Sequence, residues 1–169
     1  AIEDAIDMVD EPEFEADDCI ATVTRIGVEQ DCRVIICSTD KDLRQLLIKG
    51  QVVLARSISV RTGIEFYNAG HLLLQYGLRP DQWIDYQSLV GDTGDHIAGC
   101  PQFGDKTART LLRSVDSLEE HFKNPFKANL SERQRTILSN FRRDGLDLAR
   151  QMVTLRTDVP LPEGWEVPA

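Results

Sequence analysis

The spacing of hydrophobic residues changes twice in the first part of the chain. Apolar residues first recur at helical spacing, at Ala16, Ile20, Val23 and Ile26. This pattern predicts a helix whose end is loosened at Gly27. Residues 33–38, RVIICS, then form a β-branched run that is apolar at successive positions, which is typical of a central parallel strand buried on both faces. Helical spacing returns in DLRQLL, so the order of elements predicts an α/β domain.

Two later segments have the composition and alternation of β-strands. QVVLA begins at residue 51, and ISVRTGIEFY spans residues 58–67. The second segment predicts a hairpin that turns at Thr62 and Gly63. Asn68 follows directly and can cap a helix formed by AGHLLLQYG. The sequence therefore predicts further strands before the chain becomes helical.

Residues with known positional preferences mark the helices of the second half. Pro80 suits the first position of PDQWIDYQSLVG, and Gly91 suits its end. From Gly104 onward the hydrophobic pattern is helical, and Ser131 with Gln134 has the spacing of a capping box. The tail VPLPEGWEVPA contains three prolines and is expected to be extended. This half is predicted to be all-helical.

Composition narrows the class of protein. Hydrophobic residues make up 41% and charged residues 28% of the 169 positions, as in soluble globular domains. No apolar run approaches the roughly 18 residues of a membrane span, and the start lacks the basic region of a signal peptide. The four cysteines have no Cys-x-x-Cys spacing, so a reducing compartment is favoured over a disulfide framework or a zinc site. We therefore expect a cytoplasmic protein with no membrane partner.

The net charge of −9 is unevenly distributed. Residues 1–18 hold nine of the 28 acids and no base, which leaves 19 acids against 19 bases in the rest of the chain. Residues 123–156 reverse the balance, with eight bases and three acids. Acid at one end and base at the other suggest a metal site next to a phosphate-binding surface. Because the first residue is Ala and the start has the composition of a helix interior, we expect the chain to be a fragment.

Seven carboxylates lie in three short clusters. They are Glu15, Asp17 and Asp18 at the start of the first helix, Asp40 and Asp42 directly after the buried strand, and Asp92 and Asp95 around Gly94. The second and third clusters have alternative structural explanations, namely a helix N-cap and a solvated turn. Together they form a hard-oxygen environment suited to Mg²⁺ or Mn²⁺, and seven acids suffice for two ions. Such ions would offset the repulsion between the clustered carboxylates.

A second candidate site is the segment GCPQFGDKTARTLLRS at residues 99–114. A glycine-hinged turn that leads into a helix offers backbone amides, the Thr107 hydroxyl and the Lys106 ammonium to a phosphate. Arg109 and Arg113 continue the positive charge along that helix. The alternative is an ordinary helix with basic residues on its solvated face. The segment is a candidate contact for a nucleic-acid backbone.

Four motifs in their order along the chain resemble one known family. FEADD, STDKDLRQLL, YGLRPDQWIDYQSLVGDTGD and GCPQFGDKTARTLL are similar to the 5′-3′ exonuclease domain of bacterial DNA polymerase I and its flap-endonuclease relatives. The resemblance implies a PIN-like α/β nuclease core, with a mostly parallel central sheet flanked by helices, and then a helix-hairpin-helix-like DNA-binding subdomain. On this basis residues 1–97 are expected to be the C-terminal portion of the catalytic core and residues 98–169 the helical subdomain.

The resemblance also implies roles for individual residues. The family's metal ligands match Glu15, Asp17, Asp18, Asp40, Asp42, Asp92 and Asp95, among which the catalytic set is Asp17, Asp40, Asp42, Asp92 and Asp95. Its DNA-backbone hairpin matches Gly99, Gly104, Lys106, Thr107, Arg109 and Arg113. In the family this hairpin also holds a monovalent cation, such as K⁺, through main-chain carbonyls.

Several positions depart from the family pattern. Nothing in residues 1–12 matches the opening strand with its metal-binding Asp or the basic arch, so the chain is expected to lack the N-terminal third. His96 stands where Asn is usual, and Gln102 and Phe103 replace a smaller apolar pair. Trp83 and Tyr86 lie at helical spacing with other apolar residues and are expected in the core rather than as base-stacking platforms.

The sequence thus predicts a fragment of a divalent-metal-dependent 5′ nuclease. Its expected substrate is DNA with 5′ flaps, nicks or primers, and a polymerase domain on the same polypeptide is a candidate partner. The truncated chain alone is expected to be weakly active or inactive. Two alternatives remain open: a non-catalytic duplex-DNA-binding module with an incomplete acidic site, and an unrelated magnesium phosphohydrolase.

Overall fold

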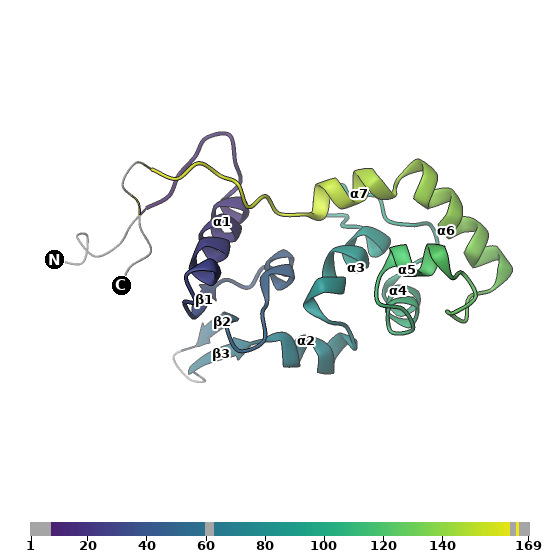
Figure 1. Cartoon of the computed structure of the whole chain (residues 1–169), viewed down its shortest axis with the longest axis horizontal. Helices are drawn as coiled ribbons and strands as arrows, with labels where there is room; N and C mark the ends of the chain where they lie inside the picture. The colour runs from purple at the N-terminus through teal and green to yellow at the C-terminus, as the bar shows by residue number, and fades with distance from the viewer. Residues whose placement is uncertain (1–7, 60–62, 163–164, 166–169) are drawn as a thin grey trace.

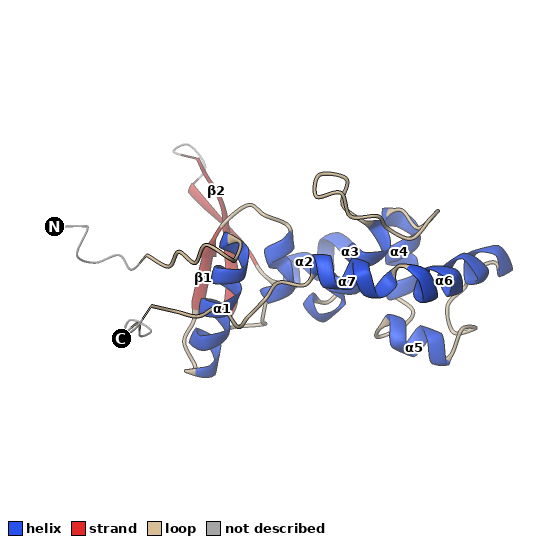
Figure 2. Cartoon of the chain, turned by 90° about the horizontal axis from the view of Figure 1, so that it is seen from above, coloured by secondary structure: helices blue, strands red, loops and turns tan. Residues whose placement is uncertain are grey.

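The computed structural model describes residues 8–59, 63–162 and 165. A three-stranded mixed sheet lies at one end of the described chain. Its strands β1 (Val34–Cys37), β2 (Val52–Ser59) and β3 (Gly63–Tyr67) follow the order β1-β2-β3. β1 pairs with β2 in parallel and β2 with β3 in antiparallel orientation. The helix α1 (Ala16–Glu29) lies beside β1, as Figures 1 and 2 show, so the predicted α/β class is confirmed.

The predicted hairpin is present as the antiparallel pair β2 and β3. Gly63 is the first residue of β3, whereas Thr62 lies outside the described residues. The two predicted strand segments around residue 56 form a single strand, β2, whose register shifts between Arg56 and Ile58. A register shift of this kind adds a local bend without ending the strand.

The expectation that β1 is buried on both faces is wrong. Ile36 is buried, but the neighbouring Ile35 is 57% exposed. β1 is an edge strand of the described sheet, and Ile35 borders an open groove of about 820 Å³ together with Leu47 and Ile48. Burial of a strand depends on the layers on either side of it, and the composition of the strand does not report those layers.

Gly27 has a different role from the predicted helix end. α1 continues two residues past it, to Glu29. A Cβ atom at Gly27 would lie 3.1 Å from Cγ2 of Val34 in β1, which is tighter than ordinary van der Waals contact. Gly27 therefore allows the helix to approach the strand closely, and helix termination is set further along.

The predicted capping residues of the middle segment are confirmed. Asn68 accepts hydrogen bonds from the N–H groups of Gly70 and His71 and so caps α2 (Ala69–Tyr76). The next turn begins at Pro80 as the 3₁₀ helix η3 (Pro80–Gln82) and continues as α3 (Trp83–Val90). α3 ends at Gly91, whose φ of 73° is accessible to glycine at little cost.

The helical half is built around α3. It contains α4 (Asp105–Leu112), α5 (Leu118–Lys123), α6 (Glu132–Asp144) and α7 (Leu146–Val153). The Ser131 capping box at the start of α6 is confirmed, with the Ser131 hydroxyl accepting from the Gln134 N–H. α3 packs against both α4 and α7 (Figure 1). The helical character predicted for this half is confirmed.

Trp83 and Tyr86 belong to the core, as predicted. Trp83 is 1% and Tyr86 8% exposed, and the ring of Tyr76 meets each of them edge-on. The guanidinium of Arg44 lies 5.0 Å from the Trp83 ring centroid and donates to the Tyr76 hydroxyl at 3.0 Å. This buried cation and aromatic cluster connects the segment after β1 to α2 and α3.

The segment after α7 runs back along α1 without helix or strand over residues 154–162, as expected for the proline-containing tail. The Val159 N–H donates to the Thr22 hydroxyl at 3.1 Å, and the Arg156 N–H donates to Asp18 at 2.8 Å. Arg25 donates in turn to the carbonyl of Thr157. The tail therefore links the helical half to α1.

Candidate metal centre and nucleic-acid interface

Three carboxylates from two separate segments meet at the end of β1. Asp42 is the first residue of the 3₁₀ helix η2 (Asp42–Leu46), and Asp92 and Asp95 lie in the loop after α3. One oxygen of each lies within 4.8 Å of an oxygen of the others. The position matches the edge of an α/β sheet at which strands end and ligands bind.

Local hydrogen bonds explain why each segment presents its acids. Asp40 accepts from the Asp42 N–H at 2.9 Å, an Asx turn that starts η2. Asp40 thus binds the first N–H of η2, although the N-cap position itself is Lys41, which forms no side-chain capping bond. Asp92 accepts from the Gly94 N–H at 2.9 Å, and its backbone exchanges two hydrogen bonds with Ile97. This closed loop holds Asp95 beside Asp92.

Lys41 places a positive charge inside the acidic cluster. Its ammonium forms an ion pair with Oδ2 of Asp92. The ammonium, together with the Gly94 N–H, holds the pKa of Asp92 below its usual range. In return, Asp92 raises the pKa of Lys41. The pair neutralises part of the negative charge of the cluster.

Asp42 has the opposite electrostatic environment. Burial raises its pKa, and the neighbouring Asp40 raises it further. Nε2 of Gln87 in α3 donates to Oδ1 of Asp42 and only partly opposes these effects. Asp42 is therefore a carboxylate whose charge is costly unless a cation is present.

The first acidic cluster contributes unequally to this centre. Burial raises the pKa of Asp17, and the charges of Asp40 and Asp42 raise it further. Asp18 accepts from the Arg156 N–H in the tail, and Glu15 is exposed at the N-cap of α1. Among the described residues the structure brings Asp42, Asp92 and Asp95 within 4.8 Å of one another, and this group does not include Glu15, Asp17, Asp18 or Asp40.

The donor set fits a hard divalent cation. The gathered side chains offer carboxylate oxygens, whereas structural zinc sites are built from Cys and His ligands. Oε1 of Gln87 is buried beside the cluster and has no hydrogen-bond partner among the described residues. Mg²⁺ and Mn²⁺ retain bound waters that can donate to such an oxygen.

Sequence analysis did not identify Lys41 or Gln87 as members of the site. Lys41 stands between two acids in STDKDL, which is a usable signal for an internal counter-charge. Gln87 lies on an apolar helix 45 residues from Asp42, and no local pattern marks it. Its contact exists only because α3 packs against η2.

The second candidate site is the turn and helix at residues 99–113. A Cβ atom at Gly99 would lie 2.5 Å from the backbone of Val90, so this position requires glycine for the close approach of two backbone segments. Gly104 is the N-cap of α4, and Lys106 is exposed in the first turn of that helix. Thr107 follows and is half-buried. Among the described residues, the Lys106 ammonium at this helix start forms no ion pair.

Arg109 of α4 and Arg113 at its C-cap contact the end of α2. Nε of Arg113 donates to the Tyr76 carbonyl at 3.0 Å, and Arg109 donates to the Gln75 carbonyl at 3.2 Å. Arg109 also pairs with Asp105 at 2.5 Å. Carbonyls at a helix C-terminus are unpaired within the helix, so these arginines satisfy them. Their predicted role in DNA binding stays a prediction.

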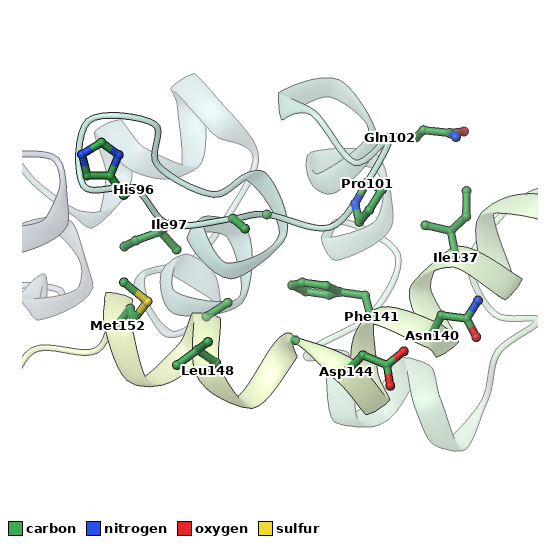
Figure 3. Close-up of a pocket in the computed structure, with 14 residues that line it drawn as sticks. His96, Ile97, Pro101, Gln102, Ile137, Asn140, Phe141, Asp144, Leu148 and Met152 are labelled. Carbon is green, nitrogen blue, oxygen red and sulfur yellow. The ribbon is translucent and has the colours of Figure 1, made fainter.

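An apolar groove of about 550 Å³ lies between the 96–102 segment and the helices α6 and α7. Figure 3 shows Met152 and Leu148 of α7 opposite Ile97, and Phe141 of α6 below Pro101. The groove is not lined by Asp42, Asp92 or Asp95. The groove is therefore separate from the acidic centre.

Comparison with protein-family models identifies the class of protein. Residues 3–77 match the N-terminal resolvase-like domain of 5′-3′ exonucleases, and residues 78–167 match their C-terminal SAM fold. The chain belongs to the 5′-3′ exonuclease family. The two models meet at residues 77 and 78, and the subdomain boundary between residues 97 and 98 stays a prediction. No helix in the described part of the chain is long and apolar enough to cross a membrane.

The particular relatives are bacterial polymerases and a phage nuclease. The chain is 35% identical to the thermostable DNA polymerase I of Thermus thermophilus over 150 residues, which is 89% of this chain and 17% of that protein. It is 34% identical to DNA polymerase I of Bacillus subtilis (strain 168), over 88% of this chain and again 17% of the relative.

Solved structures confirm the fold. The T5 5′-exonuclease with bound zinc superposes with a TM-score of 0.69 at 21% identity, over 85% of this chain and 51% of that chain. The bacteriophage T5 flap endonuclease in a pseudo-enzyme-product complex with DNA and metal ions gives 0.65 at 19% identity, over 85% of this chain and 50% of that chain. The chain thus spans about half of these structures and a smaller share of the polymerases.

Proposed function

We propose that this chain acts in the divalent-metal-dependent hydrolysis of DNA phosphodiester bonds at 5′ flaps, nicks or primers. The observation that carries the proposal is the meeting of Asp42, Asp92 and Asp95, from segments about 50 positions apart, within 4.8 Å. Membership in the 5′-3′ exonuclease family supports the same reaction. In this proposal Mg²⁺ or Mn²⁺ is the cofactor, with two ions bound.

Each residue has a distinct part in the proposed reaction. Asp42, Asp92 and Asp95 would hold one cation, and Asp17 with Asp40 would complete a second position, with Glu15 and Asp18 as outer ligands. The bound cations would supply activation of a water and stabilisation of charge at phosphorus. Asp40 keeps η2 in place through its Asx turn, and the loop closed by Asp92 keeps Asp95 in reach. No side-chain nucleophile is required.

The helix start at Gly104 would bind the DNA backbone. Lys106 and Thr107 supply an ammonium and a hydroxyl beside the free N–H groups of α4, and such groups bind phosphate. We also propose that main-chain carbonyls of the turn from Gly99 to Gly104 hold a monovalent cation such as K⁺. A polymerase domain on the same polypeptide is proposed as the partner, because the curated relatives are DNA polymerases I.

The test is cleavage of a labelled 5′-flap duplex in Mg²⁺ or Mn²⁺. Because the truncated chain is expected to be weakly active at most, we expect slow, metal-dependent release of the 5′ strand that EDTA abolishes and Asp42→Ala removes, while binding to the duplex persists. Asp147→Ala is a matched control, since Asp147 is an exposed acid on α7 remote from the cluster. Cleavage that survives both EDTA and Asp42→Ala would contradict the proposal.

A second candidate is a duplex-DNA-binding module without catalysis. It is favoured by the ion pair between Lys41 and Asp92, which neutralises part of the negative charge of the acidic cluster. This candidate predicts salt-dependent duplex binding with no cleavage at any metal concentration. Flap cleavage that responds to Asp42→Ala would exclude it.

A further inference from the structure

Gln87 is a buried amide that faces the acidic centre from α3. The residue is 6% exposed, and its Nε2 donates to Oδ1 of Asp42 across 45 positions of sequence. Its Oε1 is buried and has no hydrogen-bond partner among the described residues. One side of the amide is thus bound to the centre, while the other side has an unfilled acceptor.

The groups around Gln87 limit what can fill that acceptor. Ionised carboxylates only accept hydrogen bonds, so Asp42 and Asp92 cannot donate to Oε1. The Lys41 ammonium is directed to Asp92 in the ion pair. A water bound to a divalent cation uses its lone pair on the metal and offers two protons, which makes it the donor that this oxygen lacks.

α3 holds Gln87 firmly enough for such a role. The adjacent Tyr86 hydroxyl donates to Asp105 at 2.8 Å, and Asp85 accepts from Arg150 at 2.7 Å and from the Leu118 N–H at 2.8 Å. These contacts fix the helix to α4, α5 and α7. Gln87 therefore approaches Asp42 from a rigid support rather than from a loop.

We propose that Gln87 is a positioning residue of the metal centre. Its amide N–H group orients the Asp42 carboxylate, and its amide oxygen accepts a hydrogen bond from a water on the divalent cation held by Asp42, Asp92 and Asp95. The inference rests on the proposed metal-dependent function. Groups that orient metal ligands in this way typically change metal affinity by about 10- to 100-fold.

The test compares Mn²⁺ binding to the intact chain and to Gln87→Met by calorimetry. Methionine preserves the length and burial of the side chain but removes both hydrogen-bonding groups, so we expect Mn²⁺ affinity to fall about tenfold or more. Gln151→Met is the control, because Gln151 is exposed on α7 and its replacement leaves the affinity unchanged. Affinity within twofold of the unchanged chain in Gln87→Met would overturn the proposal.

A double-mutant cycle separates positioning from a structural role. If Gln87 acts through Asp42, Gln87→Met lowers Mn²⁺ affinity less in the Asp42→Asn variant than in the unchanged chain. If Gln87→Met acts through a general loss of packing, it lowers the affinity of both chains by the same factor. Equal losses would overturn the inference. Urea unfolding in EDTA measures the structural contribution independently.

A measurement on the unchanged chain covers the case in which Gln87→Met does not fold. The side-chain ¹⁵NH₂ signals of Gln87 should shift on addition of Mg²⁺ together with the Asp42 carboxylate signal. A shifted Asp42 with unshifted Gln87 would reject the inference while leaving the metal centre intact. Absence of any Mn²⁺ or Mg²⁺ binding would reject the proposed function and this inference together.

Discussion

At the acidic centre, burial raises the pKa values of the half-buried Asp17 and Asp42, whereas in the helical half the more deeply buried Asp85 is surrounded by donors. Asp85 accepts from Arg150 and from the Leu118 N–H, so its charge joins α3 to α7 and α5. Asp17 and Asp42 face further carboxylates instead. Buried charge supports the fold where it is paired, and it favours binding of a cation where it is crowded with like charge.

The basic residues show the same division. Arg109 and Arg113 are bound to carbonyls at the end of α2, while Lys106 on the same helix is exposed. In the sequence these three residues each contribute one positive charge and cannot be distinguished by charge alone. In the structure two of them hold helices together, and the third is available to a phosphate.

The largest expected effect tests the paired side of this comparison. Asp85→Ala leaves the Leu118 N–H and one side of Arg150 without a partner, so we expect the free energy of unfolding to fall by about 3 kcal/mol. Urea denaturation in EDTA measures the change. Asp144→Asn, which alters an exposed ion pair with Arg143, is the control and should have little effect. Equal stability of the Asp85→Ala and Asp144→Asn variants would show that the paired Asp85 does not stabilise the fold more than an exposed ion pair does.

The crowding of carboxylates at the acidic centre is tested by adding a divalent metal. Free Mn²⁺ at 100 times its dissociation constant should raise the free energy of unfolding by about 2.7 kcal/mol, because only the folded chain gathers Asp42, Asp92 and Asp95. Asp42→Asn should lose most of this response. A thermal midpoint that is identical in EDTA and in Mn²⁺ would show that the acids bind no cation.

The repulsion itself should be visible as a pH dependence in EDTA. Because the folded-state pKa of Asp17 is raised, folding favours the protonated form of this carboxyl. The resulting stabilisation of the fold is fully present below the unfolded-state pKa of about 4, and it is lost as the pH rises through the folded-state pKa. At pH 7 Asp17→Asn should therefore be slightly more stable than the unchanged chain. Urea unfolding should show the gain shrinking toward pH 4, and a gain that is constant with pH would count against the explanation.

The smallest expected effect separates the cations of α4. Lys106→Ala should weaken binding to duplexes of different sequence alike and reduce the log-log salt slope by about one. Arg113→Ala should instead lower stability through loss of its contact with the Tyr76 carbonyl and leave the slope unchanged. Fluorescence anisotropy across a salt series measures both slopes. A slope change in Arg113→Ala but not in Lys106→Ala would reverse the assignment.

Features that depend on a few neighbouring residues could be predicted from the sequence alone. The caps at Asn68 and Ser131 and the helix end at Gly91 were predicted correctly, because capping and left-handed backbone are properties of adjacent positions. The acidic motifs could likewise be located, and the family they resemble was confirmed. Such features depend only on neighbouring residues, so the sequence is enough to predict them.

Only the tertiary structure decided which of these groups meet. The exposure of Ile35, the ion pair of Lys41 and the contact of Gln87 with Asp42 all depend on segments that are distant in sequence. The same holds for Arg109 and Arg113, whose carbonyl partners lie 34 and 37 positions away. A side chain takes its burial and partners from whatever packs against it, and the packing of α3 against η2, α4 and α7 is set by the whole core rather than by any one motif.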